Sequence, residues 1–426
     1  MIRLYDFDEV KPEEILNRDI RAEADVEATV DAIIADVRAR GDAALLDYAA
    51  KFDHAQLDSV QVTQAEIDEA FAALEASDPE FITTLKMAAA NIRHFHEQQL
   101  HKNFVLNDRP GMVLGQKYTP IQRAGVYVPG GTAAYPSTVL MDVIPAKVAG
   151  VQQIVMTTPA GRDGKVNAGI LAAAVIAGID CIFKTGGAQA VAALAYGTES
   201  VPAVDKIVGP GNIYVATAKR KVFGKVGIDM IAGPSEILVL ADGTCNPAWV
   251  AADLLSQAEH DKLATPVLVT DSWDLAKAVQ AELEVQIPQL PRAAIARASV
   301  DTNGKIIVTD DMKKAIDAVN IIAPEHLEIC VDDPFAVLND IQNAGSIFLG
   351  KNVPEALGDY FAGPNHTLPT SGTARFSSPL GVDDFVKKSS FIYYTREALG
   401  EVQARIANFA EHEGLHAHAK SVTIRF

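Results

Sequence analysis

The sequence is poor in cysteine, in basic residues and in long apolar runs. Only three cysteines, Cys181, Cys245 and Cys330, occur in 426 residues, and none belongs to a C-x-x-C pair. We therefore expect no disulfide framework, and the composition fits a reducing compartment, the cytoplasm. The longest apolar stretch, 169–179, ends at Asp180 and is shorter than the roughly 20 residues that span a bilayer. The charged first ten residues predict neither a signal peptide nor a membrane anchor.

The charge balance is acidic. Lys and Arg total 37 and Asp and Glu total 55, which gives a formal net charge of −18. Nucleic acid is therefore not an expected partner, because phosphate binding needs clustered Lys and Arg. Apolar residues make up 49 %, enough for large buried cores, and the length suggests two or three domains.

The hydrophobic pattern changes along the chain. Segments 24–52 and 64–99 repeat near a 3.6-residue period and predict helices. From residue 122, alanine-rich helical stretches alternate with short β-rich runs, which are 125–128, 153–158, 181–185, 206–208, 237–241, 267–270, 305–309 and 346–349. This alternation predicts βαβ units and an α/β fold with two doubly wound, mainly parallel sheets. After residue 379 the pattern becomes helical again, most clearly over 396–413.

Glycine clusters follow several of these predicted strands, at 129–131, 186–188 and 209–211. In open α/β sheets ligands bind at the carboxyl ends of strands, where glycine lets backbone N–H groups approach a phosphate. None of the clusters completes a G-x-G-x-x-G fingerprint, since Tyr214 stands where the third glycine would be. A tight turn that needs a positive φ explains each cluster equally well.

Two short segments combine ionisable and polar side chains. Gln257 and His260 lie three residues apart on a predicted helix, so they share a face and could hold a metal, although a partly buried histidine with a polar neighbour is commoner. Glu325 and His326 stand side by side in an apolar segment. Burial there raises a carboxyl pKa and lowers that of an imidazole, which makes both usable as acid or base. The equally good alternative is a helix start with Pro324 in its first turn.

Two further segments carry histidines. The Gly- and Pro-rich segment 357–369 contains Asp359 and His366, and is either a functional loop or a surface turn. The segment 411–418 holds three of the ten histidines. Metal binding is one interpretation of this tail, but composition alone favours a solvated tail.

Eight motifs occur in a fixed order, and together they resemble the histidinol dehydrogenase family across nearly the whole chain. They are YVPGG at 127–131, GGAQA at 186–190, GPGN at 209–212, DMIAGPSE at 229–236, LLSQAEH at 254–260, PEHL at 324–327, GPNH at 363–366 and EGL at 413–415. Each motif alone is modest, whereas the ordered set is specific.

The resemblance implies roles for individual residues and two cofactors, NAD⁺ and one Zn²⁺ per subunit. The implied zinc ligands are Gln257, His260, Asp359 and His418. The implied acid–base pair is Glu325 and His326, and the implied NAD contacts are Tyr127, Gln189 and Asn212. The implied substrate contacts are Ser235, His366 and Glu413, together with His326 and the four zinc ligands. The family is a homodimer with a shared zinc site, so His418 would serve the partner subunit.

The resemblance also implies a domain plan, with two incomplete Rossmann-like doubly wound domains and small helical segments at each end. The expected parts are an N-terminal helical arm (1–23), a first Rossmann-like domain (24–126, continued by 237–379), a second one (127–236) and a C-terminal helical dimerisation arm (380–426). The implied reaction is the zinc-dependent oxidation of L-histidinol through L-histidinal to L-histidine with two NAD⁺, the last step of histidine biosynthesis.

Three other functions were weighed against this one. A related zinc-dependent NAD dehydrogenase for another amino alcohol or small polyol is disfavoured by His366 and Glu413, which match substrate contacts. A non-catalytic zinc- or nucleotide-binding protein is disfavoured by the intact pair Glu325 and His326. A cysteine-dependent aldehyde dehydrogenase is disfavoured because no cysteine stands in a convincing nucleophile setting.

Overall fold

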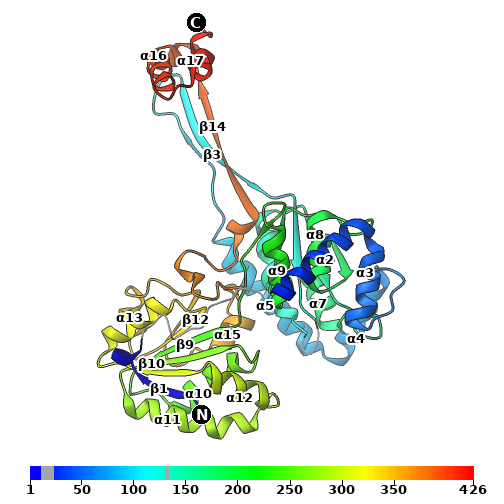
Figure 1. Ribbon diagram of the computed structural model, residues 1–426, viewed down its shortest axis with the longest axis vertical. Coiled ribbons are helices and arrows are strands. Elements are labelled where there is room, and N and C mark those ends of the chain that lie inside the picture. The colour runs from blue at the N-terminus through cyan, green and yellow to red at the C-terminus, as the bar shows by residue number, and fades with distance from the viewer. Residues whose placement is uncertain (11–23, 131–133) are drawn as a thin grey trace. The chain divides into compact units, whose positions relative to one another are not determined.

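The computed structural model describes residues 1–10, 24–130 and 134–426. The chain divides into two compact units, one of residues 1–99 and 122–385 and one of residues 100–121 and 386–426. The first unit contains two parallel sheets with helices around them, and the second contains an antiparallel sheet and two helices (Figure 1). The predicted α/β class with two incomplete Rossmann-like parts is confirmed.

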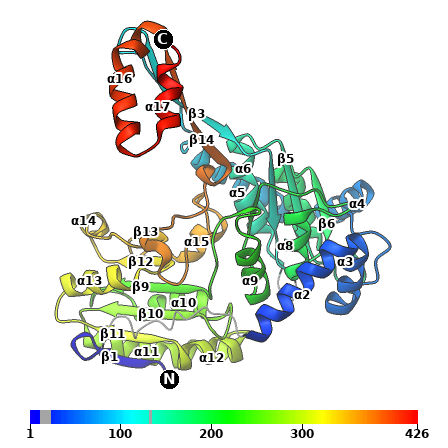
Figure 2. The same ribbon diagram turned by 45° about the horizontal axis from the view of Figure 1, so that its top comes forward.

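One sheet of the first unit has six parallel strands in the order β1-β11-β10-β9-β12-β13. These are β1 (Arg3–Asp6), β9 (Glu236–Ala241), β10 (Thr265–Thr270), β11 (Lys305–Val308), β12 (His326–Cys330) and β13 (Ser346–Leu349). Figure 2 shows β1 at the edge, beside β11. The described start of the predicted N-terminal helical arm is therefore a strand followed by a short 3₁₀ turn, η1 (Phe7–Glu9), and residues 11–23 lie outside the described residues.

The other sheet has five parallel strands in the order β6-β5-β4-β7-β8. They are β4 (Arg123–Tyr127), β5 (Gln153–Thr158), β6 (Cys181–Lys184), β7 (Lys206–Val208) and β8 (Gly227–Ile228). If the strands of each sheet are counted from β4 and from β9, the five-stranded sheet has the order 3-2-1-4-5, and the six-stranded sheet has the same order with β1 added beside strand 3. The chain reverses direction across the sheet between β4 and β7, and again between β9 and β12, which is where doubly wound folds form crevices.

Helices connect the strands of both sheets. The five-stranded sheet has α6 (Pro136–Ala149), α7 (Ala168–Ala177), α8 (Gly187–Tyr196) and α9 (Ile213–Val222). The six-stranded sheet has α10 (Pro247–Ala258), α11 (Trp273–Gln286), η3 (Ile287–Gln289), α12 (Ala293–Thr302), α13 (Met312–Ile322), α14 (Pro334–Leu338) and α15 (Glu355–Tyr360). Two 3₁₀ turns, η4 (Thr373–Arg375) and η5 (Val382–Phe385), lie in the last part of this unit.

Strand β9 shows why these sheets need helices on both faces. All six of its residues are buried. Ile237 and Val239 join the apolar cluster on one face, and Leu238 and Leu240 join the cluster on the other. A strand covered on both sides is a continuous apolar run without polar alternation, which is typical of parallel sheets.

The N-terminal helices differ from the predicted domain plan. They are α2 (Ala24–Arg40), α3 (Asp42–Tyr48), the π-helical turn η2 (Ala49–Asp53), α4 (Gln64–Ser77) and α5 (Pro79–Glu97). Sequence analysis grouped residues 24–126 with the six-stranded part, but α2 contacts α8 and α9, α4 contacts α7, and α5 contacts α6. The reason is apolar burial, since Val30 and Val37 of α2 belong to the same cluster as Val191 and Leu194 of α8.

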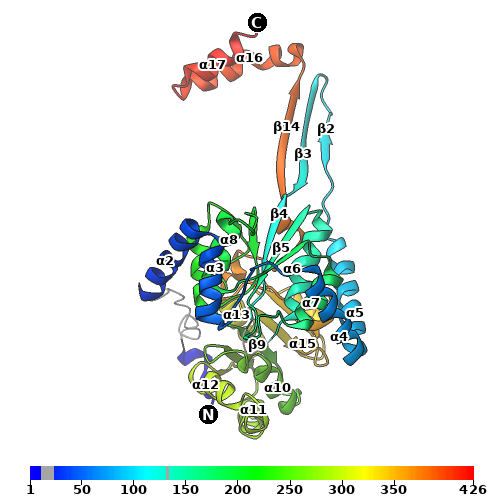
Figure 3. The same cartoon turned by 90° about the vertical axis from the view of Figure 1, so that its right-hand side faces the viewer.

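The second unit pairs two segments that lie far apart in the sequence. Strand β3 (Met112–Pro120) lies antiparallel between β2 (Phe104–Leu106) and β14 (Val386–Tyr394), as Figure 3 shows. Two helices follow, α16 (Arg396–His412) and α17 (His416–Thr423). The predicted helical arm 380–426 therefore contains a nine-residue strand before its helices, because the aromatic and β-branched residues of 391–394 favour extended structure.

All three cysteines are free thiols, and Cys245 and Cys330 are buried. Among the described residues, no helix is both long and apolar enough to cross a membrane.

Candidate active site

Glu325 and His326 lie where the chain enters β12. Helix α13 ends at Ile322, and Ala323 takes a left-handed conformation (φ 50°) that turns the chain into the strand. The alternative of a helix start at Pro324 is therefore wrong, since His326 is the first residue of β12. This position is the amino end of the strand, opposite to the carboxyl edge at which doubly wound sheets usually bind ligands.

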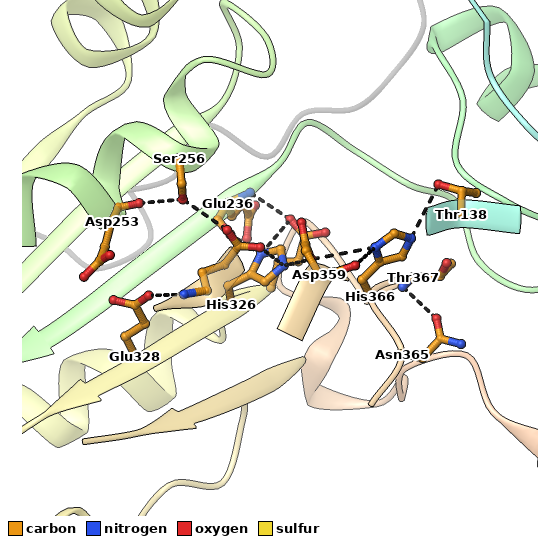
Figure 4. A network of polar contacts seen from close by, with 12 residues as sticks. Thr138, Glu236, Asp253, Ser256, His326, Glu328, Asp359, Asn365, His366 and Thr367 are labelled. Carbon is orange, nitrogen blue, oxygen red and sulfur yellow. Dashed lines mark hydrogen bonds and ion pairs between the residues drawn. The ribbon is translucent and has the colours of Figure 1, made fainter. Parts of the chain in front are cut away.

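The backbone of one residue, Glu236, orients both side chains. Glu325 Oε2 accepts a hydrogen bond of 2.8 Å from the backbone N–H of Glu236. His326 Nδ1 lies 2.9 Å from the carbonyl oxygen of the same residue (Figure 4). A carbonyl oxygen only accepts, so His326 Nδ1 carries the proton of that bond. The lone pair of a neutral imidazole would then be on Nε2, which faces the other side of the site.

Two carboxylates of α15 lie on that side. His326 Nε2 is 3.7 Å from Glu355 Oε1 and 3.7 Å from Asp359 Oδ1. Glu355 and Asp359 are four residues apart, so one face of the short helix presents both. Ser256 Oγ of α10 donates to Glu355 Oε2 at 3.1 Å. Sequence analysis missed Glu355, although its spacing from Asp359 was a usable signal.

His366 completes this part of the site. Its Nδ1 lies 3.1 Å from the backbone oxygen of Asp359, and its Nε2 lies 3.4 Å from the hydroxyl of Thr138. A cavity of about 260 Å³ opens here, lined in part by His326, Phe348, Asp359 and His366. The site thus has room for a small molecule beside two imidazoles and a carboxylate.

The ionisable groups strongly influence one another. Burial raises the pKa of the Glu325 carboxyl to about 8. Burial acts to lower the pKa of His326, but three nearby carboxylates outweigh it and raise that pKa to about 10. Burial likewise raises the pKa of Glu355, to about 7. For Asp359 burial acts upward, yet the neighbouring histidines hold its pKa below the usual range. This cluster therefore favours a positive charge in its midst.

The same residues fit a divalent metal ion. One ligand atom from each of His326, Glu355 and Asp359 lies within 4.8 Å of the other two. His326 Nε2 and Glu355 Oε1 are buried and make no hydrogen bond within the described part of the chain. Imidazole and carboxylate donors suit zinc.

Of the predicted zinc ligands, three lie in the same unit and close to this cluster. Asp359 belongs to it directly. Gln257, on α10, is buried and acts to lower the pKa of Glu355 against the effect of burial. Burial lowers the pKa of His260, and the charge of Asp359 partly opposes that shift. His418 lies exposed on α17 of the second unit. The complete set of four stays a prediction.

The predicted substrate contacts are similarly divided. Ser235 immediately precedes β9 and is the neighbour of Glu236, whose backbone orients Glu325 and His326. Glu413 follows α16 and is exposed in the second unit. Their contact with a substrate, like that of His366, stays a prediction.

The predicted cofactor residues follow strands of the five-stranded sheet. Tyr127 ends β4, and its hydroxyl accepts a hydrogen bond of 3.2 Å from the Gly187 N–H at the start of α8. Gln189 is buried on α8. Asn212 follows β7 and caps α9, since its Oδ1 accepts hydrogen bonds from the first turn. Tyr127 and Asn212 thus flank the point where the strand order reverses, the usual crevice for a dinucleotide.

Comparison with known proteins agrees with this geometry. The family model described as histidinol dehydrogenase matches residues 16–426. The chain belongs to the histidinol dehydrogenase family. It is 54 % identical over 420 residues to a histidinol dehydrogenase of Listeria monocytogenes, covering 98 % of this chain and 96 % of that one. A relative from Bacillus subtilis is 58 % identical over 368 residues, 86 % of each chain. The crystal structure of a histidinol dehydrogenase from Elizabethkingia anophelis has a TM-score of 0.94 at 38 % identity, covering 100 % of this chain and 98 % of that one.

The family motif GPNH at 363–366 is anchored to α6, a helix of the other sheet. Asn365 Nδ2 donates to the backbone oxygen of Met141 at 2.6 Å. Thr367 Oγ1 donates to Asp142 Oδ1 at 2.9 Å. These two bonds flank His366 and fix its backbone. Asp142 is buried, and burial followed by the charge of Asp229 raises its pKa to about 8.

Asp142 should make the stability of the protein depend on pH. The folded carboxyl keeps its proton up to about pH 8, whereas in the unfolded chain it loses the proton near its ordinary pKa of about 4. Its contribution is thus fully present below about pH 4 and is lost as pH rises to 8. The free energy of unfolding should fall less steeply with rising pH in Asp142→Asn than in wild type, by up to about 1.4 kcal/mol per pH unit. Urea unfolding between pH 5 and 8 measures this slope.

The matched control is Asp317→Asn, at an exposed position of α13, which should leave the slope unchanged. Parallel curves for wild type and Asp142→Asn would contradict the raised pKa.

Proposed function

We propose that this chain is a zinc-dependent histidinol dehydrogenase that oxidises L-histidinol through L-histidinal to L-histidine and reduces two NAD⁺. The observation that carries the proposal is the buried pair Glu325 and His326, which the backbone of one residue, Glu236, orients so that His326 Nε2 faces Asp359. Membership of the family adds support from outside the site.

Zinc would be held by Gln257, His260 and Asp359 together with His418 of the partner subunit, and when bound it would orient the amine and imidazole of the substrate. Its positive charge would also offset the carboxylates that raise the pKa of His326 in the metal-free chain. The imidazole would then be neutral near neutral pH, with its lone pair on Nε2.

His326 would remove the hydroxyl proton of the alcohol as hydride leaves for the nicotinamide. Its Nδ1–H bond to the Glu236 carbonyl keeps Nε2 as the accepting atom. Glu325 would activate water for attack on the aldehyde, since a pKa near 8 allows it to exchange protons close to neutral pH. Ser235, His366 and Glu413 would contact the substrate, and Tyr127, Gln189 and Asn212 would contact NAD.

The reaction should produce two NADH for each histidinol consumed, because the same pair serves an alcohol step and an aldehyde step. A strong chelator should abolish NADH formation, and added zinc should restore it. Absorbance at the NADH band against histidinol consumed measures the ratio, with other amino alcohols as parallel substrates. One NADH with free aldehyde accumulating, full activity in metal-free protein, or a preference for another amino alcohol would contradict the proposal.

Substitutions of Glu325 and of His326 should slow different half-reactions. His326→Ala should slow oxidation of the alcohol, and Glu325→Gln should slow oxidation of supplied histidinal more, each by about 10²–10⁴-fold, the usual range for a lost acid or base. Single-turnover rates with histidinol and with histidinal separate the two steps. Equal and small losses in both steps for both variants would remove these roles.

A zinc site shared between subunits predicts complementation. His260→Ala and His418→Ala should each be nearly inactive alone. When the two are unfolded together and reassembled, each mixed dimer should contain one site with both lesions and one intact site. Activity should return to at most about a quarter of wild type, since random pairing makes half of the dimers mixed. No recovery, with dimers verified by size, would mean that His418 serves its own chain.

A further inference from the structure

The turn after β7 depends on one glycine. Gly209 has φ 115°, a conformation that side chains disfavour, and a Cβ atom at this position would overlap the carbonyl oxygen of Tyr127. Glycine is required here. Because glycine has no Cβ atom, its backbone can adopt more conformations than that of any other residue. The turn leads directly to Asn212 and α9. Something else must therefore fix its conformation.

A buried ion pair contacts both polar groups of that glycine. Asp229 Oδ2 accepts the Gly209 N–H at 2.8 Å, and Lys219 Nζ donates to the Gly209 carbonyl oxygen at 2.9 Å. Lys219 of α9 and Asp229, just after β8, also pair with each other, and their side chains are 2 % and 1 % exposed. The two side chains thus bind Gly209 through both its N–H and its C=O, and we call Lys219 and Asp229 together the clamp.

The charges around this clamp balance. Asp142 Oδ2 also lies close to Gly209, near enough to be 3.1 Å from a Cβ built there. Burial raises the pKa of Asp142 to about 8, with a further contribution from Asp229, so at neutral pH Asp142 is uncharged. That leaves one positive and one negative charge, Lys219 and Asp229, paired at the glycine.

Stability alone is a weak reason for such a pair. Removing two charges from water costs about as much as their attraction returns, and apolar side chains of similar volume often serve a core as well or better. The ion pair differs from apolar side chains because it fixes the orientation of the backbone. It binds both the N–H and the C=O of Gly209. The segment is the one at which the strand order reverses.

We propose that Lys219 and Asp229 are positioning residues for the dinucleotide: by gripping Gly209 they hold the 209–212 turn, and with it Asn212, in the conformation that receives NAD. This inference rests on the proposed NAD dependence. It assigns a role to the first residue of the DMIAGPSE motif and to a helix residue outside the motifs. Neither side chain needs to touch the cofactor.

The test measures NAD affinity separately from stability. Lys219→Met and Asp229→Leu each remove one half of the grip. Each should weaken NAD binding, measured by calorimetry on the full-length protein, about tenfold, the factor expected when one hydrogen bond to a charged group is lost. The KM for NAD should rise in parallel, while the KM for histidinol and the zinc content stay close to wild type.

The matched control is Val222→Ala, which removes buried apolar volume from the same helix without altering the polar contacts of Gly209. It should lower the midpoint of unfolding. Its NAD affinity should stay within about twofold of wild type, because the contacts of Lys219 and Asp229 with Gly209 remain. Should Lys219→Met or Asp229→Leu fail to fold, Asp229→Asn replaces them, because it keeps the shape and the acceptor for the Gly209 N–H but removes the negative charge. Its NAD affinity should also fall.

The outcomes separate the two proposals. If wild type binds NAD and the clamp variants bind it equally well, or lose affinity only as far as Val222→Ala does, the positioning role is overturned and the proposed function stands. If wild type neither binds NAD nor forms NADH from histidinol, the proposed function fails and this inference fails with it.

Discussion

The backbone of a single residue, Glu236, controls the geometry of the site. Its N–H and its carbonyl oxygen bind Glu325 and His326 respectively, so the relative position of the two side chains is set by backbone atoms of β9. The parallel pairing of β9 with β12 places Glu236 beside these two side chains, with His326 opposite Ile237. Because all residues of β9 are buried between two apolar clusters, this reference point is among the least mobile parts of the fold.

The electrostatics of the site follow from crowding acids around one imidazole. Glu325, Glu355 and Asp359 lie near His326, and their combined charge overcomes the effect of burial on its pKa. The raised pKa favours the positively charged form of His326, which would suit a purely structural role. The proposed base needs a lower pKa, which a divalent cation among the same carboxylates would supply. Under the proposed function the acids and the metal would be parts of one charge balance, so Glu325 and His326 alone do not account for the site.

Much of this architecture was predictable because strands buried on both faces are apolar throughout. The runs 153–158, 206–208 and 346–349 coincide with β5, β7 and β13. Strand β12 was missed because Glu328 interrupts its apolar run, and that buried carboxylate finds its partner in the backbone N–H of Glu355, 27 residues further on. The domain plan that the resemblance implied placed residues 24–126 with the six-stranded sheet, whereas α2, α4 and α5 contact helices of the other sheet. Periodicity alone could not place these helices, because it shows that a face is buried but not against what. In the site, His366 belongs to the GPNH motif, whereas Asp359 and Glu355 both lie outside every motif. The resemblance to the family implied a role for Asp359 but none for Glu355.

The edge strand β1 has a consequence for biosynthesis. Residues 3–6 leave the ribosome well before their partner β11, which lies about 300 residues later in the chain. At translation rates of 5–20 residues per second, the N-terminal strand waits roughly 15–60 s before its place in the sheet exists. During that time its N–H and C=O groups have no native strand to pair with, and an unpaired strand is a template for association with other chains. Nascent chains of this protein are thus expected to need shielding at the very segment that later closes the edge of the sheet.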